Sequence, residues 1–274
     1  MQNLTYSKNK QKLRTSLVLL QLQGLKDLFS SNNIDFILLK GSALLIENSL
    51  LFEGRKFADI DVLIKPEDLI RVYKSLKGGG YKLIGFNGSN HFTFYNPSQF
   101  LPVEVHIGLV NKKSPWQRLI FREENLDLWN GSVHIEREGK AFRVLNNEDG
   151  FIYTCFHMFK EAFLEDKWWQ DLEFYYPYVD LKTLLRKAQQ TGSLKVVSLC
   201  LLGLTQNLRL REYLFKKGDF IEKFLLKHIM SRKNIFKYRF ILYLYATDSL
   251  SCKIKILLNS IVYSIIKVYG LFFK

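Results

Sequence analysis

The chain has 274 residues and a formal net charge of +14, and 47% of its residues are apolar. This composition excludes global disorder and is sufficient for one large domain or two modest ones. The three cysteines are odd in number, far apart and without metal or redox spacing, so they predict buried thiols in a reducing cytoplasm.

A helix and a strand are the first elements predicted along the chain. Residues 1–14 are polar and charged and lack the hydrophobic stretch of a secretory signal, which also favours a cytoplasmic location. Leucines repeat through residues 11–30 with the spacing of an amphipathic helix. The short apolar run of residues 36–39 then predicts a buried strand.

A tight turn and a second helix follow this strand. Gly41 permits a tight turn or the close approach of a phosphate group, and Ser42 is a preferred type of helix N-cap. Residues 43–47 predict the helix itself. Because backbone N–H groups at a helix N-terminus attract anions, this turn is a candidate phosphate site.

Residues 58–64 predict a second strand, which carries two aspartates. Side chains alternate along a strand, so Asp59 and Asp61 project from the same face. Two like charges side by side are unfavourable unless a cation neutralises them, and a pair of carboxylates suits Mg²⁺. An exposed edge strand with a charged outer face is the simpler alternative. The segment is apolar on both faces apart from the aspartates, which favours a central strand and a metal site.

The rest of the chain divides into a mixed part and a helical part. Pro66 opens a helix that continues to residue 76. Strands are predicted at residues 81–86, 91–95, 103–109, 133–138 and 141–145, the second and third as an antiparallel pair and the last two as a hairpin. The pattern is helical from residue 147 onward. We therefore predict an α+β domain at residues 1–146 and a mainly α-helical domain at residues 147–274.

These motifs together resemble a known superfamily. Gly41 and Ser42 before a helix, followed by Asp59 and Asp61 on the next strand, resemble the nucleotidyltransferase superfamily related to polymerase beta. The fuller string resembles a family of uncharacterised bacterial nucleotidyltransferases often found beside polysaccharide and peptide natural-product genes; it comprises residues 39–43, Arg55, residues 59–64, Gly80, Tyr81 and residues 103–106. The resemblance covers residues 34–109 and implies a nucleotidyltransferase-type mixed sheet with flanking helices.

The superfamily usually has a third carboxylate on a later strand, next to the first two. Glu104 is the candidate, although relatives more often have aspartate there. It shares a strand face with His106. His106 could orient an acceptor group or bind a phosphate, and a hydrogen-bonded structural histidine is equally well supported.

The resemblance implies metal-dependent transfer of a nucleoside monophosphate from an NTP such as ATP to a hydroxyl or phosphate acceptor. Two Mg²⁺ ions, or Mn²⁺ in their place, would be bridged by Asp59 and Asp61, with Glu104 holding the second metal or accepting the acceptor's proton. Charge on the transferred group would be met by Lys40 and Arg55. Gly41 and Ser42 would bind the terminal phosphates. Arg55 as a plain surface charge is the alternative, with near-even support.

The helical half suggests further partners. Its aromatic region, residues 151–180, is best explained by packing of the helices, and an acceptor or base-stacking pocket facing the active site is the alternative. We expect His157 and Asp171 to be structural. Residues 209–274 contain 14 basic and 4 acidic residues among many aromatics, so they could contact RNA or an anionic membrane at the cell periphery. An ordinary basic face of a helical bundle explains them equally well. A second function class follows, in which an inactive nucleotidyltransferase-fold module binds RNA, membrane or a protein partner through this half.

Overall fold

The computed structural model describes residues 2–48, 58–87, 90–111, 114–163, 165–204 and 239–247, together with Phe224, Lys227, Lys253 and Ile254. Arg55, Cys252 and most of the basic segment 209–274 lie outside these residues. The two other cysteines, Cys155 and Cys200, are buried free thiols, as predicted.

All described strands belong to the first part of the chain. The elements of this part are α1 (Gln2–Ser30), β1 (Phe36–Leu38), α2 (Lys40–Glu47), β2 (Ile60–Ile64), η1 (Pro66–Asp68), α3 (Leu69–Gly78), β3 (Lys82–Asn87), β4 (His91–Tyr95), β5 (Val103–His106), α4 (Pro115–Ile120), η2 (Glu123–Asn125), β6 (Val133–Arg137) and β7 (Lys140–Val144). The described elements of the second part are helical: α5 (Asn147–Lys160), α6 (Asp166–Tyr175), η3 (Tyr176–Tyr178), α7 (Leu181–Thr191), α8 (Leu194–Leu204) and α11 (Arg239–Ala246).

The seven strands form one mixed sheet in the order β3-β4-β5-β2-β1-β7-β6. Strand β2 lies in the interior, antiparallel to β1 and parallel to β5, and all five of its residues are buried. The strand with Asp61 is therefore central, and the alternative of an exposed edge strand is wrong. The predicted antiparallel pairing of β4 with β5 is confirmed, with Phe94 opposite Val103.

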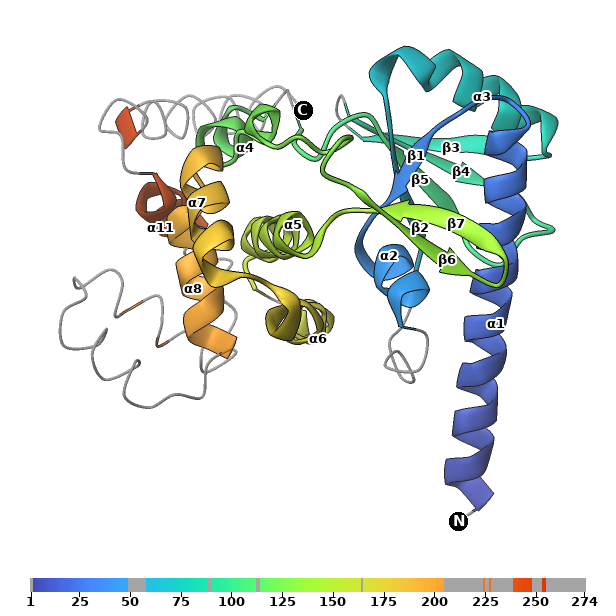
Figure 1. Cartoon of the computed structure of the whole chain (residues 1–274), viewed down its shortest axis with the longest axis horizontal. Coiled ribbons are helices and arrows are strands. Elements are labelled where there is room, and N and C mark those ends of the chain that lie inside the picture. Colours follow the sequence, from blue (N-terminus) through green and yellow to red (C-terminus); the bar gives the residue numbers. More distant parts are fainter. Residues whose placement is uncertain are drawn as a thin grey trace, which may run out of the picture.

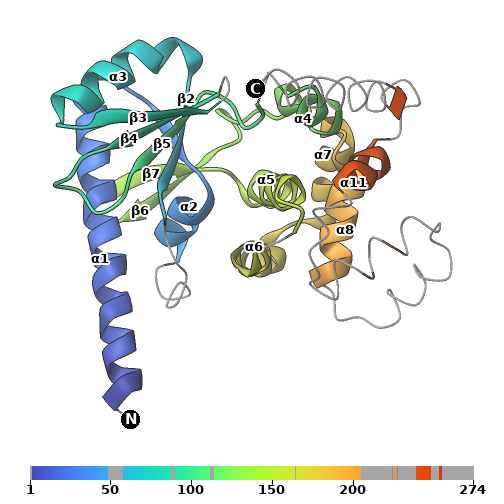
Figure 2. The ribbon, with the colours of Figure 1, turned by 180° about the vertical axis from the view of Figure 1, so that it is seen from behind.

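Helices cover the sheet on two sides. Figures 1 and 2 show α1 on one side of the sheet and the helices α5 to α8 on the other. Apolar residues at helical spacing attach α1 to the core, and Phe29 packs edge-on against Phe36 of β1 at a centroid distance of 5.2 Å. The helix is longer than predicted, because it begins at Gln2 and its first half extends beyond the sheet (Figure 1). None of the described helices is both long and apolar enough to cross a bilayer.

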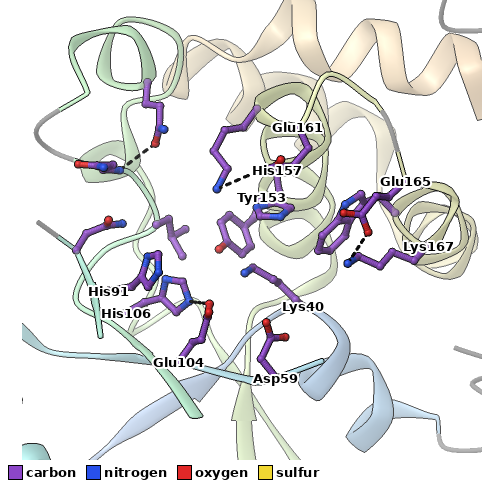
Figure 3. A pocket seen from close by; sticks show the side chains of 16 residues that line it. Lys40, Asp59, His91, Glu104, His106, Tyr153, His157, Glu161, Glu165 and Lys167 are labelled. Carbon is purple, nitrogen blue, oxygen red and sulfur yellow. Dashed lines mark hydrogen bonds and ion pairs between the residues drawn. The ribbon is translucent and has the colours of Figure 1, made fainter. Parts of the chain in front are cut away.

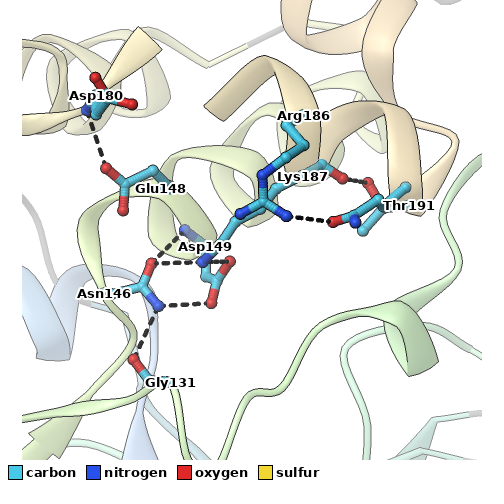
Figure 4. Close-up of polar contacts among 9 residues, drawn as sticks. Gly131, Asn146, Glu148, Asp149, Asp180, Arg186, Lys187 and Thr191 are labelled. Carbon is cyan, nitrogen blue, oxygen red and sulfur yellow. Dashed lines mark hydrogen bonds and ion pairs between the residues drawn. The ribbon is translucent and has the colours of Figure 1, made fainter. Parts of the chain in front are cut away.

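A buried polar network fixes the passage from the sheet to the helical half (Figure 4). Asn146 caps α5, since its side-chain oxygen accepts from the backbone N–H of Asp149, and its amide donates to the carbonyl oxygen of Gly131. The Asp149 carboxylate is almost fully buried and pairs with Lys187 Nζ of α7 at 2.8 Å. The ion pair joins α5 to α7, and the hydrogen bonds of Asn146 join both to the segment at Gly131.

Glu47, at the end of α2, gives a prediction about stability and pH. Burial raises the pKa of its carboxyl to about 7, and within the described residues its Oε1 atom has no hydrogen-bond partner. A carboxyl with a raised folded-state pKa stabilises the fold below its unfolded pKa of about 4.5, and this contribution is lost as the pH rises through 7. We expect Glu47→Gln to raise the free energy of unfolding by about 1–2 kcal/mol at pH 8 and to change it little at pH 4.

Urea unfolding of both proteins at several pH values measures this difference. Glu136→Gln, at an exposed position of β6, is the matched control and should show no pH-dependent gain. An equal effect of Glu47→Gln at pH 4 and pH 8 would contradict the electrostatic explanation.

Candidate functional site

The central strands bring together three of the predicted site residues. Asp61 of β2 stands directly opposite Glu104 of β5 in the parallel ladder, so their side chains leave the same face of the sheet. His106 follows on that face two residues later. One ligand atom from each of these residues lies within 4.8 Å of the others, which is close enough to hold a single metal ion.

Asp61 is the electrostatic centre of this group. Its side chain is 3% exposed, and its Oδ1 atom accepts from Lys40 Nζ at 2.7 Å and from His106 Nε2 at 2.8 Å. Burial alone would raise the pKa of this carboxyl, but the charge of Lys40 and the hydrogen bond from His106 hold it well below its usual value. Burial likewise disfavours the charged form of Lys40 and would lower its pKa. The charge of Asp61 outweighs this effect of burial, so the pKa of Lys40 is raised. Asp61 and Lys40 are therefore an ion pair.

The turn before α2 differs from the predicted one. The helix begins at Lys40 with Leu39 as its N-cap, so Ser42 lies inside the first turn and is not the cap. The Ser42 hydroxyl instead accepts from the backbone N–H of Asp61 at 3.3 Å, which attaches α2 to the neighbouring strand. The left-handed residue of the turn is Lys40, with φ of 51°, and not Gly41. A non-glycine residue in this region is strained, and here it carries its ammonium group to Asp61.

Glu104 and His106 differ from Asp61 in their charge state. Burial, together with the charges of Asp61 and Asp59, raises the pKa of Glu104 to about 7. Burial lowers the pKa of His106 even though Asp61 accepts its hydrogen bond, so the ring is neutral at neutral pH. Because its Nε2 atom faces a carboxylate, we assign the ring proton to Nε2.

A cavity of about 500 Å³ lies between the sheet and the helical half (Figure 3). Lys40, Asp59, Glu104 and His106 line its sheet side. Its other residues are His91, Asn90, Leu109, Asn111, Gln117, Tyr153, His157, Lys160, Glu161, Glu165, Lys167 and Trp168. The lining is predominantly polar, so the cavity is suited to a charged or hydroxyl-rich substrate.

Helix α5 supplies functional candidates that the sequence analysis did not assign. Tyr153, His157 and Lys160 are spaced by four and three residues, so they share one helix face, and that face lines the cavity (Figure 3). Burial lowers the pKa of His157 well below its usual value and raises that of Tyr153, so both groups are neutral. The sequence offered a pocket facing the active site as one interpretation of residues 151–180, but no signal there assigned these three side chains to it.

The remaining predicted site residues have different positions. Asp59 precedes β2 and lines the cavity, although it is not part of the group formed by Asp61, Glu104 and His106. Gly41 and Ser42 are buried within α2. Arg55 lies outside the described residues, and its predicted role stays a prediction.

A comparison with known protein families identifies the family of this chain. A family model described as an uncharacterised nucleotidyltransferase matches residues 1–208, which include every element of the candidate site. The chain belongs to this nucleotidyltransferase family. The matched region includes the mixed sheet, α2 and α5, and the resemblance inferred from the sequence motifs is thereby confirmed.

Three solved structures are similar to parts of this chain at low identity. The crystal structure of ANT(2″)-Ia in complex with adenylyl-2″-tobramycin is 11% identical, with a TM-score of 0.47 over 64% of this chain and 97% of its own. The lincomycin-bound lincosamide antibiotic adenylyltransferase LnuA is 14% identical, with a TM-score of 0.40 over 58% and 96%. An antigenic nucleotidyltransferase-like protein from Paracoccidioides brasiliensis is 15% identical, with a TM-score of 0.43 over 78% and 92%. Such values say nothing about the substrate of this family member. No curated protein matches the chain.

Proposed function

We propose that this protein transfers a nucleoside monophosphate from an NTP to a hydroxyl or phosphate acceptor, in the cytoplasm and with a divalent metal ion. One observation carries the proposal. In a chain of the nucleotidyltransferase family, Asp61, Glu104 and His106 converge to within 4.8 Å beside a polar cavity. The cavity is bounded by two separate walls, so a nucleotide and an acceptor can meet there.

The donor set fits a divalent cation. Two carboxylates suit Mg²⁺, which retains positions for substrate phosphates, and an added imidazole is also accepted by Mn²⁺. Asp61 and Glu104 would hold the ion, and His106 belongs to the same group of possible ligands. Asp59 offers a further carboxylate at the cavity. A bound Mg²⁺ or Mn²⁺ would neutralise phosphate charge and favour ionisation of an attacking hydroxyl.

The proposed reaction uses the side chains of the cavity in the following way. An acceptor oxygen attacks the α-phosphorus of the NTP, a new P–O bond forms, and the bond to the β-phosphate breaks with release of pyrophosphate. Where Glu104 does not hold the ion, it receives the acceptor's proton, and its raised pKa of about 7 suits that exchange near neutral pH. Lys40 balances phosphate charge once it is released from Asp61, and the backbone N–H groups near Gly41 bind terminal phosphates.

The helical wall is assigned to the acceptor. Tyr153 and His157 present a neutral hydroxyl and a neutral imidazole to the cavity, opposite the carboxylates (Figure 3). Lys167 on this wall pairs with Glu165 at 2.6 Å. The neutral side chains of Tyr153 and His157 can orient an acceptor hydroxyl toward Glu104 without adding a charge of their own.

Metal-dependent nucleotide binding tests the proposal directly. The thermal midpoint of the protein should rise with an NTP and Mg²⁺ together, and much less with either alone, because ligands that bind the folded state stabilise it. The double variant Asp59→Ala, Asp61→Ala should show no such rise. A wild-type protein without any Mg²⁺-dependent shift for four NTPs would favour the alternative of an inactive module.

Glu104→Gln separates the role of this residue from plain binding. We expect kcat to fall by about 10²-fold or more with a smaller effect on NTP affinity, because a proton acceptor acts mainly in the transition state. Steady-state kinetics and NTP titration measure the two effects. If NTP affinity fell while turnover was preserved, Glu104 would belong to the NTP-binding side, and its assignment as proton acceptor would be wrong.

The alternative of an inactive binding module depends on the basic segment 209–274. Its 14 basic and 4 acidic residues support contact with RNA or an anionic membrane, but most of this segment lies outside the described residues. We retain such a contact as a proposal that rests on charge alone. The preserved carboxylates at the cavity favour the enzymatic function, because a binding module has no need of them.

A further inference from the structure

Helix α1 (Gln2–Ser30) has apolar residues on two faces. One set is buried against the sheet and consists of Val18, Leu22, Leu25 and Phe29. A second set comprises Leu13, Leu17 and Leu20, whose exposed fractions are 61%, 36% and 65%. Spacings of four and three residues place these three leucines in one stripe on the outer side of the helix.

The stripe continues onto the body of the protein. Leu17, Leu20 and Phe100 line one groove of about 540 Å³ beside α1, and Phe100 is 37% exposed. The guanidinium group of Arg14 lies over the Phe100 ring at 5.7 Å from its centroid. We call Leu13, Leu17, Leu20 and Phe100 the leucine patch.

The charge near the leucine patch is mainly positive, because Asp27, which lines the same groove, is paired with Lys140. Residues 1–26 contain five basic residues and no acidic one, whereas residues 27–208 are balanced, with 21 basic and 22 acidic residues. Lys12 and Arg14 are offset from Leu13 by about 100° to either side of the helix, so they flank the stripe. An apolar stripe bordered by cations is the pattern of a helix that lies in the surface of an anionic membrane.

Other occupants of the leucine patch fit less well. A second copy would bring two uniformly basic segments together, and the apolar end of the same chain, residues 254–273, is itself basic without any acid. RNA would satisfy the cations and leave the exposed leucines in water. An anionic bilayer meets both requirements, because its headgroups attract the lysines and its acyl boundary accepts the leucines.

We propose that the outer face of α1 docks this protein on the surface of an anionic lipid bilayer. The helix lies across the sheet from the helices that wall the cavity, so docking in this way leaves the cavity uncovered (Figure 2). The proposal concerns a different part of the sequence from the basic segment 209–274. It is also independent of the nucleotidyl transfer proposed above.

The test uses the full chain and sedimentation with vesicles of phosphatidylcholine mixed with phosphatidylglycerol, compared with pure phosphatidylcholine. We expect binding to the anionic vesicles only. The triple variant Leu13→Ser, Leu17→Ser, Leu20→Ser should weaken it at least about tenfold, and so should Lys8→Gln, Lys10→Gln, Lys12→Gln. The matched control Leu83→Ser, Ile84→Ser, Phe86→Ser alters exposed apolar residues of edge strand β3 and should bind like the wild type.

Four results would overturn the proposal. Absence of vesicle binding by the wild type would overturn it. Vesicle binding by the triple serine variant at the wild-type level would also overturn it, because the contact would then lie elsewhere in the chain. A wild-type dimer that the serine variant dissociates, measured by light scattering, would identify a second copy as the occupant. Loss of the cooperative thermal transition in the serine variant would make the leucine patch part of the core.

Discussion

Asp61→Asn is expected to abolish nucleotide transfer, lowering kcat/KM by about 10³-fold or more, which corresponds to about 4 kcal/mol of lost transition-state stabilisation. Asp61 is the residue on which the site converges, since Lys40 and His106 contact its carboxylate and Glu104 stands opposite it in the sheet. Asparagine is a poor ligand for a divalent cation by comparison and carries no charge. Release of labelled pyrophosphate from an NTP, with Mg²⁺ present, measures the loss.

Stability distinguishes this effect from a damaged fold. From the sequence alone, removing one of two adjacent aspartates should relieve repulsion and leave the fold unchanged or slightly more stable. In the structure Asp61 is already paired, so we expect Asp61→Asn to cost about 1–3 kcal/mol by leaving the Lys40 ammonium without its counter-charge. The double variant Lys40→Met, Asp61→Asn should regain stability and remain inactive.

Asp27→Asn is the matched control, because Asp27 is exposed on α1 and pairs with Lys140 far from the cavity. It should keep full activity. Mg²⁺-dependent turnover by Asp61→Asn at the level of this control would remove the central claim about the site.

Lys187→Met is expected to destabilise the protein by about 2–4 kcal/mol, because it leaves the Asp149 carboxylate buried without a cation. That carboxylate is 2% exposed, and its other partner is the neutral amide of Asn146 (Figure 4). The network joins the end of the sheet to α5 and α7, so its loss should shift the global unfolding transition to lower urea concentration. Urea unfolding followed by circular dichroism measures the change.

Two further variants make this prediction specific. Adding Asp149→Asn to Lys187→Met should restore part of the lost stability, because no charge then remains buried. Lys167→Met removes a pair with Glu165 whose side chains are 33% and 50% exposed, and it should cost no more than about 1 kcal/mol. Equal losses from Lys167→Met and Lys187→Met would show that burial of Asp149 contributes nothing.

The family, the mixed sheet and the strands that carry Asp61 and Glu104 could be predicted from the amino-acid sequence. These features depend on local signals, namely the alternation of apolar residues along each strand and the short spacing of Gly41, Ser42 and the aspartates. The central position of β2 could also be inferred, because a strand that is apolar on both faces must be covered on both sides.

The composition of the site depends on contacts between distant segments, which the sequence does not reveal. The register between β2 and β5 sets Asp61 beside Glu104, and the backbone of Lys40 turns its ammonium toward Asp61. The opposite wall comes from α5, about forty residues after β5, and packing between distant segments makes its Tyr153 and His157 line the same cavity as the carboxylates of Asp59 and Glu104. Periodicity reports which face of a helix is apolar, but not which element that face will meet, because contacts between distant segments depend on the whole fold.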